Sequence, residues 1–234
     1  MDDYKQIVDA IALSMGAAWA SGVNLYAAIL VLGLLSITGN IALPETLHVL
    51  NEPVVLFAAG FMFMVEFFAD KTPGVDTGWD AIHTFIRIPA GAALAAGAVG
   101  DVNPAVMVAA GIVGGGVAAA THATKAGSRV LINTSPEPFT NWAASIGEDM
   151  AVVAGLWAAL HYPLVFICLL IIFLLMLVWL LPKLWRGIKK VFGFLKRLVT
   201  GKKQEDDPKQ PQDAKADDAS AEIGLTPVEN EKSV

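Results

Sequence analysis

Residues 164–181 read LVFICLLIIFLLMLVWLL, an apolar run that contains no charged side chain. A helix of about 20 residues crosses the hydrocarbon core of a bilayer, so a run of this length is typical of a membrane-spanning helix. A soluble fold would have to bury every face of such a helix, whereas lipid accepts all of them. The stretch therefore predicts an integral membrane protein.

The composition of the whole chain agrees with this prediction. Hydrophobic residues make up 55% of the 234 residues, charged residues only 16%, and the mean hydropathy is +0.58. A water-facing fold of this size cannot hide that much apolar surface, which argues against a soluble enzyme. The one cysteine, Cys168, excludes a disulfide framework and a cysteine-based zinc cluster.

Five further apolar segments approach the length of a span, which predicts an all-α integral membrane protein. We expect about six transmembrane helices in a bundle over residues 1–182, and the second of them is short for a crossing. The expected helices cover residues 11–37, 53–68, 81–99, 104–120, 142–160 and 164–181. No secretory signal is expected before them, because the chain opens with Asp2 and Asp3 where such a signal carries positive charge.

The placement of lysine and arginine predicts the orientation of the bundle, because these residues are retained on the cytoplasmic side during insertion. Lys71, Lys125 and Arg129 lie near two connections on one side, and eight more basic residues follow in 183–203. The connections on the other side, 39–52, 100–103 and 161–163, contain neither lysine nor arginine. We therefore expect a multi-pass protein of the bacterial inner membrane with both termini in the cytoplasm.

The chain beyond the last expected span divides into two parts. In residues 183–203, basic and apolar residues alternate at helical spacing, which predicts an amphipathic interfacial helix on the anionic inner leaflet. A plain stop-transfer charge cluster is the alternative, and no nucleic-acid partner is expected because the apolar face needs the adjacent bilayer. Residues 204–234 hold nine of the 22 acidic residues and three of the 16 basic ones, and this acidic tail is expected to be disordered.

Two polar stretches interrupt the apolar pattern, and the first covers residues 66–89. Its polar residues recur at steps of three or four, so they share helix faces. Ionisable groups at membrane depth usually face a protein interior or a wet cavity and pair with one another. A structural ion-pair cluster at the cytoplasmic interface is the alternative. The candidate site residues of this stretch are Glu66, Asp70, Asp76, Asp80, His83 and Arg87.

The second polar stretch covers residues 122–149. Its first half places polar residues on one helix face, and two adjacent acids follow about two turns into the fifth expected span. Those acids have no lysine neighbour in sequence, so they need cations from elsewhere, and Arg87 is one of the few available. The candidate site residues here are His122, Lys125, Arg129, Asn133, Glu137, Asn141, Glu148 and Asp149.

Three further patterns concern packing. The spacing Pro-x-x-x-Thr-x-Trp occurs at residues 73–79 and 136–142, which suggests an internal two-helix repeat of the kind that frames transporter sites. The glycines and alanines of 111–120 allow close helix contacts and are compatible with a homo-oligomer. Ser21, Gly22 and Asn24 interrupt the first expected span. Both a helix break that exposes backbone to a site and a packed asparagine explain this interruption.

The strings ADKTPGVD at residues 69–76 and SPEPF at residues 135–139, with the first span, resemble a family of small multi-pass membrane proteins. This is the domain-of-unknown-function family 4126, and the resemblance covers residues 10–180. It implies a helical membrane protein and no particular activity. Residues 66–72 are also similar to a signature of calcium/manganese cation–proton exchangers. That second resemblance implies a divalent-cation site, with Glu66, Asp70 and Asp149 as candidate metal ligands.

Three functions fit these features, and the leading hypothesis is a transporter or channel for a small ion or solute. A divalent cation exchanged for protons is one candidate substrate, with His83 or His122 carrying the proton. The second hypothesis is a membrane enzyme on a lipid or phosphate headgroup, with those histidines as acid–base groups and Arg87 and Arg129 on phosphate. No common serine, zinc or phosphate-loop motif supports it. The third is a scaffold that recruits partners through residues 183–234.

Overall fold

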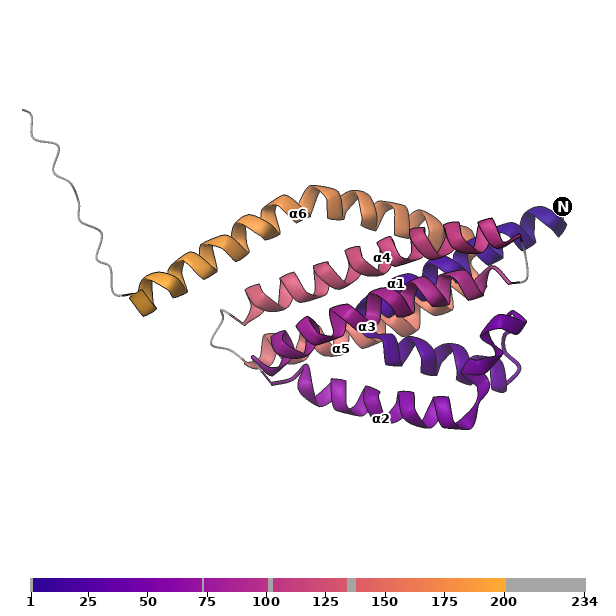
Figure 1. Ribbon diagram of the computed structural model, residues 1–234, viewed down its shortest axis with the longest axis horizontal. Coiled ribbons are helices and arrows are strands. Elements are labelled where there is room, and N and C mark those ends of the chain that lie inside the picture. Colours follow the sequence, from indigo (N-terminus) through magenta and orange to yellow (C-terminus); the bar gives the residue numbers. More distant parts are fainter. Residues whose placement is uncertain (1, 73, 101–102, 134–137, 201–234) are drawn as a thin grey trace, which may run out of the picture. The chain divides into compact units, whose positions relative to one another are not determined.

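The computed structural model describes residues 2–72, 74–100, 103–133 and 138–200. The described residues form helices and no strand, which confirms the all-α membrane fold. The acidic tail at 204–234 lies outside the described residues, and α6 continues through most of the segment predicted as a separate interfacial helix. The elements in Figure 1 are α1 (Asp2–Ile37), η1 (Glu45–Asn51), α2 (Pro53–Ala69), α3 (Val75–Ala98), α4 (Pro104–Ile132), α5 (Pro138–His161) and α6 (Pro163–Thr200).

Local sequence explains where these helices begin. A proline stands at the first position of α2, α4, α5 and α6, where its missing N–H leaves no helical bond unmade. The side chain of Asn103 caps α4 by accepting a hydrogen bond from the N–H of Ala105 at 2.9 Å. Gly74 precedes α3 with φ of 87°, a left-handed conformation that suits glycine. The starts predicted for α2, α4 and α6 lie within one residue of those found, whereas α1 and α3 begin earlier than predicted and α4 and α6 continue well beyond their apolar runs.

Five of the described helices, α1, α3, α4, α5 and α6, are long and apolar enough to cross a membrane. The elements η1 and α2 pass the same test only as a pair, and that pair is bent by 64°. The predicted count of six spans is reached only if the bent pair is one span. This agrees with the short apolar run noted for the second expected helix, since α2 has 17 residues.

Helix α1 is broken at Asn24, whose backbone is extended (φ −148°, ψ 101°). The Oδ1 atom of Asn24 accepts a hydrogen bond from the N–H of Ala27 at 3.0 Å, so its side chain caps the helical segment that follows. Asn24 and Ser21 are both buried, as expected where non-helical backbone lies at membrane depth. The asparagine is packed and the helix is also broken, while exposure of the freed backbone to a site stays a prediction.

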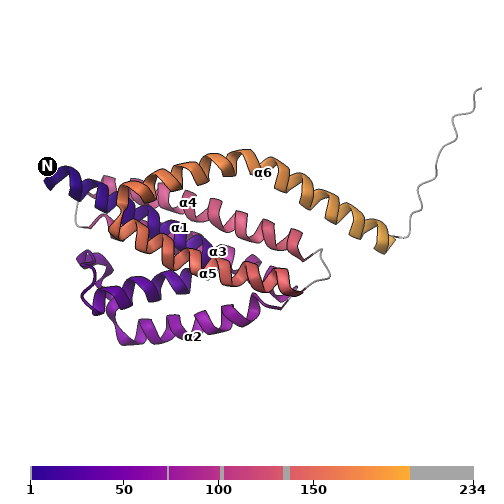
Figure 2. The same ribbon diagram turned by 180° about the vertical axis from the view of Figure 1, so that it is seen from behind.

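After Asn24, α1 turns back along the bundle. Ser14 donates its hydroxyl to the carbonyl of Ala95 near the C-terminal end of α3, at 2.8 Å. Tyr26, just past the break, contacts His83 in the first half of α3, at 3.0 Å. Figures 1 and 2 then show the following segment returning toward the end of the bundle where α1 begins.

The N-terminal end of α1 therefore lies beside the turn between α3 and α4 and the junction of α5 and α6. Gly16 packs against Ala159 in the last turns of α5, in agreement with this arrangement. The connections after α2 and after α4 lie at the other end of the bundle (Figure 1). The break at Asn24 thus lies in the interior of the bundle, between its two ends.

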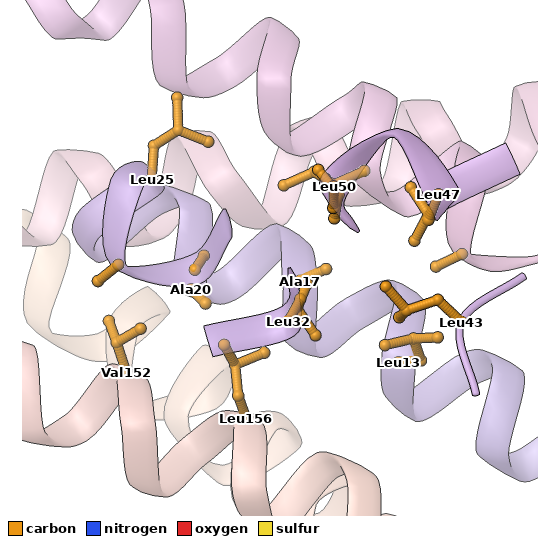
Figure 3. Close-up of a cluster of buried hydrophobic side chains, with 14 of the residues drawn as sticks. Leu13, Ala17, Ala20, Leu25, Leu32, Leu43, Leu47, Leu50, Val152 and Leu156 are labelled. Carbon is orange, nitrogen blue, oxygen red and sulfur yellow. The ribbon is translucent and has the colours of Figure 1, made fainter. Parts of the chain in front are cut away.

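The main apolar core surrounds the returning α1. Side chains from both sides of the break gather with leucines of η1 and with one face of α5 (Figure 3). Burial of these groups stabilises the hairpin that the two parts of α1 form. The labelled members are Leu13, Ala17, Ala20, Leu25, Leu32, Leu43, Leu47, Leu50, Val152 and Leu156.

The close contact between α3 and α4 depends on small residues. A Cβ built on Gly114 would overlap the Cβ of Ala95, and Ala18 of α1 would lie only 3.3 Å from it. Gly116, two residues on, is exposed and meets nothing within 4 Å. The glycine-rich segment therefore has one face toward the bundle and another away from it, as small residues in packed membrane helices allow.

We expect Gly114→Val to destabilise the fold, because backbone of three helices would have to move. Overpacking of this kind costs about 1–3 kcal/mol. Gly116→Val places the same side chain on the same helix without a neighbour and should change the melting temperature little. Thermal unfolding of the two purified variants in one detergent measures the difference. Equal melting temperatures would contradict the close packing of α4 against α3.

Candidate functional site

The structure brings the two polar stretches together inside the bundle. Charged side chains from α2, the turn after it, α3, α4 and α5 meet there, and most are less than 4% exposed. We call this group the charge cluster. Its members are Glu66, Asp70, Asp80, Arg87, Lys125, Arg129 and Glu148.

Lys125 lies at the centre of the charge cluster. Its Nζ atom is 2.8 Å from Asp70 Oδ2, 3.1 Å from Glu66 Oε1, 3.5 Å from Glu148 Oε2 and 3.9 Å from Asp80 Oδ1. One ammonium therefore has four carboxylates around it. Three of these acids are buried with it, and Glu148 is 19% exposed.

Arg87 connects α3 to α2 and α4 from a fully buried position. Its guanidinium donates to Glu66 Oε1 at 2.5 Å and to Asp80 Oδ1 at 3.2 Å. Its Nη1 also lies 3.3 Å from Nδ1 of His122. Because a guanidinium presents fixed, planar donors, these contacts hold Arg87 in one orientation.

Arg129 makes the corresponding connection at the end of α4. It donates to Glu148 Oε2 at 2.6 Å, to Asn141 Oδ1 at 2.5 Å and to the carbonyl of Asp70 at 3.1 Å. These partners belong to α5 and to the turn after α2. The buried guanidinium thus joins three segments that are distant in sequence.

Several polar atoms in the charge cluster have no hydrogen-bond partner. Glu66 Oε2, Asp70 Oδ1 and Asp80 Oδ2 are buried and accept no hydrogen bond from the described residues, and the other oxygen of each carboxylate contacts Lys125. A buried polar atom without a partner is costly, and such atoms often mark a water or ion position. These three oxygens belong to three different carboxyl groups, each of which contacts Lys125 through its other oxygen.

Asp76 is buried but belongs to a different arrangement, since no ion pair to it is found among the described residues. It accepts hydrogen bonds from the N–H groups of Gly74 at 2.9 Å and Thr77 at 2.6 Å. The amide of Asn133 donates to both of its oxygens, at 2.8 and 2.9 Å, and Asn141 approaches at 3.4 Å. This carboxylate therefore fastens the start of α3 to the ends of α4 and α5.

The contacts of the two predicted histidines define their tautomers. The carbonyl of Trp79 accepts from Nδ1 of His83, and Nε2 of His83 lies 3.0 Å from the hydroxyl of Tyr26. Arg87 can only donate, so Nδ1 of His122 accepts, and its Nε2 donates to the carbonyl of Asp80 at 3.1 Å. The imidazole of His122 is therefore neutral in this arrangement.

The broken helix borders the charge cluster. The side chain of Asn24 donates to Oδ1 of Asp149 at 2.9 Å, which ties the break to α5. Asp149 follows Glu148 directly, and both are partly exposed. Discontinuous helices present free backbone groups and the ends of half-helix dipoles, which suits ion binding.

Sequence reasoning missed three side chains that contact the predicted residues. Tyr26 bonds to His83, and Thr84 Oγ1 lies 2.8 Å from Nε2 of His122. Asn24 was recognised as an interruption but not as a site residue. Each stands on an apolar helix close to an expected polar position, and only the reversal of α1 brings Tyr26 and Asn24 to the site.

The predicted metal ligands do not meet around an open position. Lys125 lies between Glu66 and Asp70, and Asp149 bonds to Asn24 instead. Within the described ranges, no group of three or more histidine, cysteine, aspartate or glutamate residues is arranged to hold a metal ion. Glu137, which was predicted as a site residue but not as a metal ligand, lies outside the described residues.

Lys71 lies at the edge of the charge cluster, in the turn after α2. Its ammonium is 2.9 Å from the centre of the Phe67 ring and 5.9 Å from that of Trp142, and it donates to the carbonyl of Phe67 at 3.2 Å. Burial lowers the pKa of Lys71 from its ordinary value. A cation over aromatic rings is attracted by their negative faces, so these contacts help to hold Lys71 in place.

These features define the class of protein: a helical membrane protein whose bundle encloses a cluster of charged side chains. The chain belongs to the family described as Domain of unknown function (DUF4126), whose model matches residues 11–183. No curated protein and no solved structure matches the chain. The similarity of residues 66–72 to cation–proton exchangers is not shown by these comparisons.

Proposed function

We propose that this protein is a membrane transporter or channel for a small ion or solute, and that the charge cluster is its binding site. The observation that carries the proposal is the arrangement around Lys125, where one buried ammonium has four carboxylates within 4 Å. Charges at membrane depth are expensive, and they are retained mainly where a substrate, ion or proton passes.

The balance of charge supports this function over a purely structural network. The charge cluster holds four acids against three cations, Arg87, Lys125 and Arg129. A network that served packing alone would lower its desolvation cost by matching charges. The one excess negative charge calls for a proton or a bound cation. The four acids are Glu66, Asp70, Asp80 and Glu148.

The surroundings of the charge cluster support access from one side. Glu148 is 19% exposed while the acids beside it are at most 3% exposed, so α5 carries the most accessible acid of the charge cluster. The break in α1 lies next to it, because Asn24 donates to Asp149, the residue after Glu148. Membrane transporters commonly bind substrate between such broken helices near mid-membrane.

No described contact favours the enzyme hypothesis. Both ring nitrogens of His83 and of His122 already contact protein groups, and the two arginines bind acids rather than open space. The scaffold hypothesis and the anionic-leaflet partner depend on residues 183–234, most of whose side chains lie outside the described part. Both stay predictions.

We propose that the connections after α2 and α4 and the part of α6 around Lys183 face the cytoplasm of a bacterial inner membrane. Lys71, Lys125 and Arg129 lie toward this end, as retained positive charges require. Lys183 stacks on Trp179 at 2.9 Å, a pair suited to a membrane–water interface. For the N-terminus we propose the opposite side, because α1 begins at the other end of the bundle.

A flux assay tests the proposed function. The purified full-length chain in proteoliposomes should carry at least one of H⁺, Na⁺, K⁺, Mg²⁺, Ca²⁺, Mn²⁺ or small anions faster than protein-free vesicles. Asp70→Asn should lower that flux at least about tenfold, because it removes a buried charge that contacts Lys125 and Arg129.

Glu45→Gln is the matched control, since this exposed carboxylate in η1 is far from the charge cluster. Its flux should equal that of the unmodified chain. Circular dichroism and gel filtration establish that both variants remain folded. Flux at the level of empty vesicles across the whole panel, or an Asp70→Asn variant as active as the control, would refute the proposal.

A further inference from the structure

Asp80 differs from the other acids of the charge cluster in how closely cations approach it. Its nearest cation is Arg87 at 3.2 Å, and Lys125 follows at 3.9 Å. Each of the other three acids has a cation within 2.8 Å. These pairs are Glu66 with Arg87 at 2.5 Å, Asp70 with Lys125 at 2.8 Å and Glu148 with Arg129 at 2.6 Å. Because attraction between charges falls with distance, a negative charge on Asp80 is the least compensated of the four.

The charge cluster as a whole has one negative charge more than its cations balance. Four carboxyl groups stand against one ammonium and two guanidinium groups, and all three cations are buried. An uncompensated carboxylate at membrane depth is costly, and a carboxyl group avoids this cost by binding a proton. A single proton makes the charges equal. It interferes least with the ion pairs when it binds to the acid whose pairs are longest.

The free oxygen of Asp80 provides a second observation. The side chain is 1% exposed, and its Oδ2 atom accepts no hydrogen bond from the described residues. Arg87 and Lys125 both approach the other oxygen, Oδ1. A neutral carboxyl group carries its proton on one oxygen and accepts hydrogen bonds on the other, so the two oxygens of Asp80 are placed as in a protonated side chain.

We propose, on the basis of the proposed function, that Asp80 binds and releases one proton and that the proton is an ion that this protein carries. On release, the O–H bond at Oδ2 breaks, the proton passes to water and the electron pair stays on the carboxylate. The ionisable groups that surround Asp80 are Glu66 of α2, Asp70 of the turn after it, Arg87 of α3, and His122 and Lys125 of α4. Tyr26 of α1 contacts His83, three residues further along α3.

Infrared spectroscopy of the full-length chain tests for this proton directly. A protonated carboxyl group has a carbonyl stretch that a carboxylate lacks, so its band should be present near neutral pH and disappear as the pH is raised. The band should shift when aspartate is labelled with ¹³C at the side-chain carboxyl group. The same label on glutamate should leave it in place, because the proton is assigned to an aspartate.

Asp80→Asn should abolish this band, because the amide has no carboxyl proton. Glu45→Gln, which changes an exposed acid of η1 in the same way, is the matched control and should keep the band at full intensity. If Asp80→Asn does not fold, Asp80→Glu keeps an acid at this position. The band of that variant should follow the glutamate label instead of the aspartate label.

Proton movement is measured in proteoliposomes that contain a pH-sensitive dye, with each ion of the flux panel present in turn. Asp80→Asn should slow the change of internal pH at least about tenfold relative to the unmodified chain, whereas Glu45→Gln should leave it unaltered. A band that is missing near neutral pH, or that survives in Asp80→Asn, would overturn the inference, and so would flux of another ion at constant internal pH. These results would leave transport of another solute intact. A band that depends on Asp80 without flux of any ion would refute the proposed function alone.

Discussion

Replacing Arg87 with leucine should destabilise the protein by about 3–5 kcal/mol, the cost of removing one member of a buried ion pair. Arg87 is fully buried and contacts Glu66 at 2.5 Å and Asp80 at 3.2 Å. Its loss leaves both acids with only the ammonium of Lys125 to balance them. Reversible unfolding in mixed detergent micelles measures the change in the free energy of unfolding.

A second variant separates charge from packing. Adding Glu66→Gln to Arg87→Leu removes one negative charge together with the positive one and should recover at least half of the lost stability. Arg186→Leu, on an exposed arginine of α6, is the control and should change stability by less than about 0.5 kcal/mol. A small effect of Arg87→Leu, comparable to this control, would mean that Arg87 is not buried between the two acids.

Asp76→Ala should have the next largest effect, about 3 kcal/mol. Asp76 accepts from two backbone N–H groups at the start of α3 and from the side-chain amide of Asn133 at the end of α4. Removing it leaves several buried donors without an acceptor, and each such donor costs about 1–3 kcal/mol. Unlike Arg87, its loss should spare the charge cluster and act on the junction of three helices.

Asp76→Asn keeps the shape of the side chain but directs an amide group at donors, so it should restore less than half of the stability. Asp3→Ala, near the exposed beginning of α1, provides the control and should have no measurable effect. Hydrogen exchange of the first turn of α3 locates the change. Unaltered protection there in Asp76→Ala would contradict the fastening role of this carboxylate.

The sequence was sufficient to predict the helices and the polar residues of the site. Apolar length and proline positions specify spans, because lipid requires every backbone group to be bonded within a helix. Placing a charged side chain at membrane depth costs free energy, so charged residues within apolar segments are candidates for a site. Glu66, Arg87 and Arg129 could be selected on this basis without coordinates. In the structure Glu66 pairs with Arg87, and Arg129 pairs with Asp70 and Glu148.

The partners of these residues could not be derived from spacing. Asp76 and Asp80 look equivalent in sequence, yet amides surround the first and cations surround the second. Which neighbours each acid meets depends on how the helices of the bundle pack together, and this packing is a long-range property. The reversal of α1 was also unforeseen, since an asparagine within an apolar run fits a straight helix as well.

The turning point at Asn24 has a consequence for the order in which the chain assembles. The arm after it, residues 25–37, is too short to cross the bilayer, and its path depends on contacts with η1 and α3 that are synthesised later. It cannot be stable in lipid until those elements have been synthesised. During biogenesis, the part of α1 before Asn24 is therefore inserted in the membrane before residues 25–37 can pack in their final position.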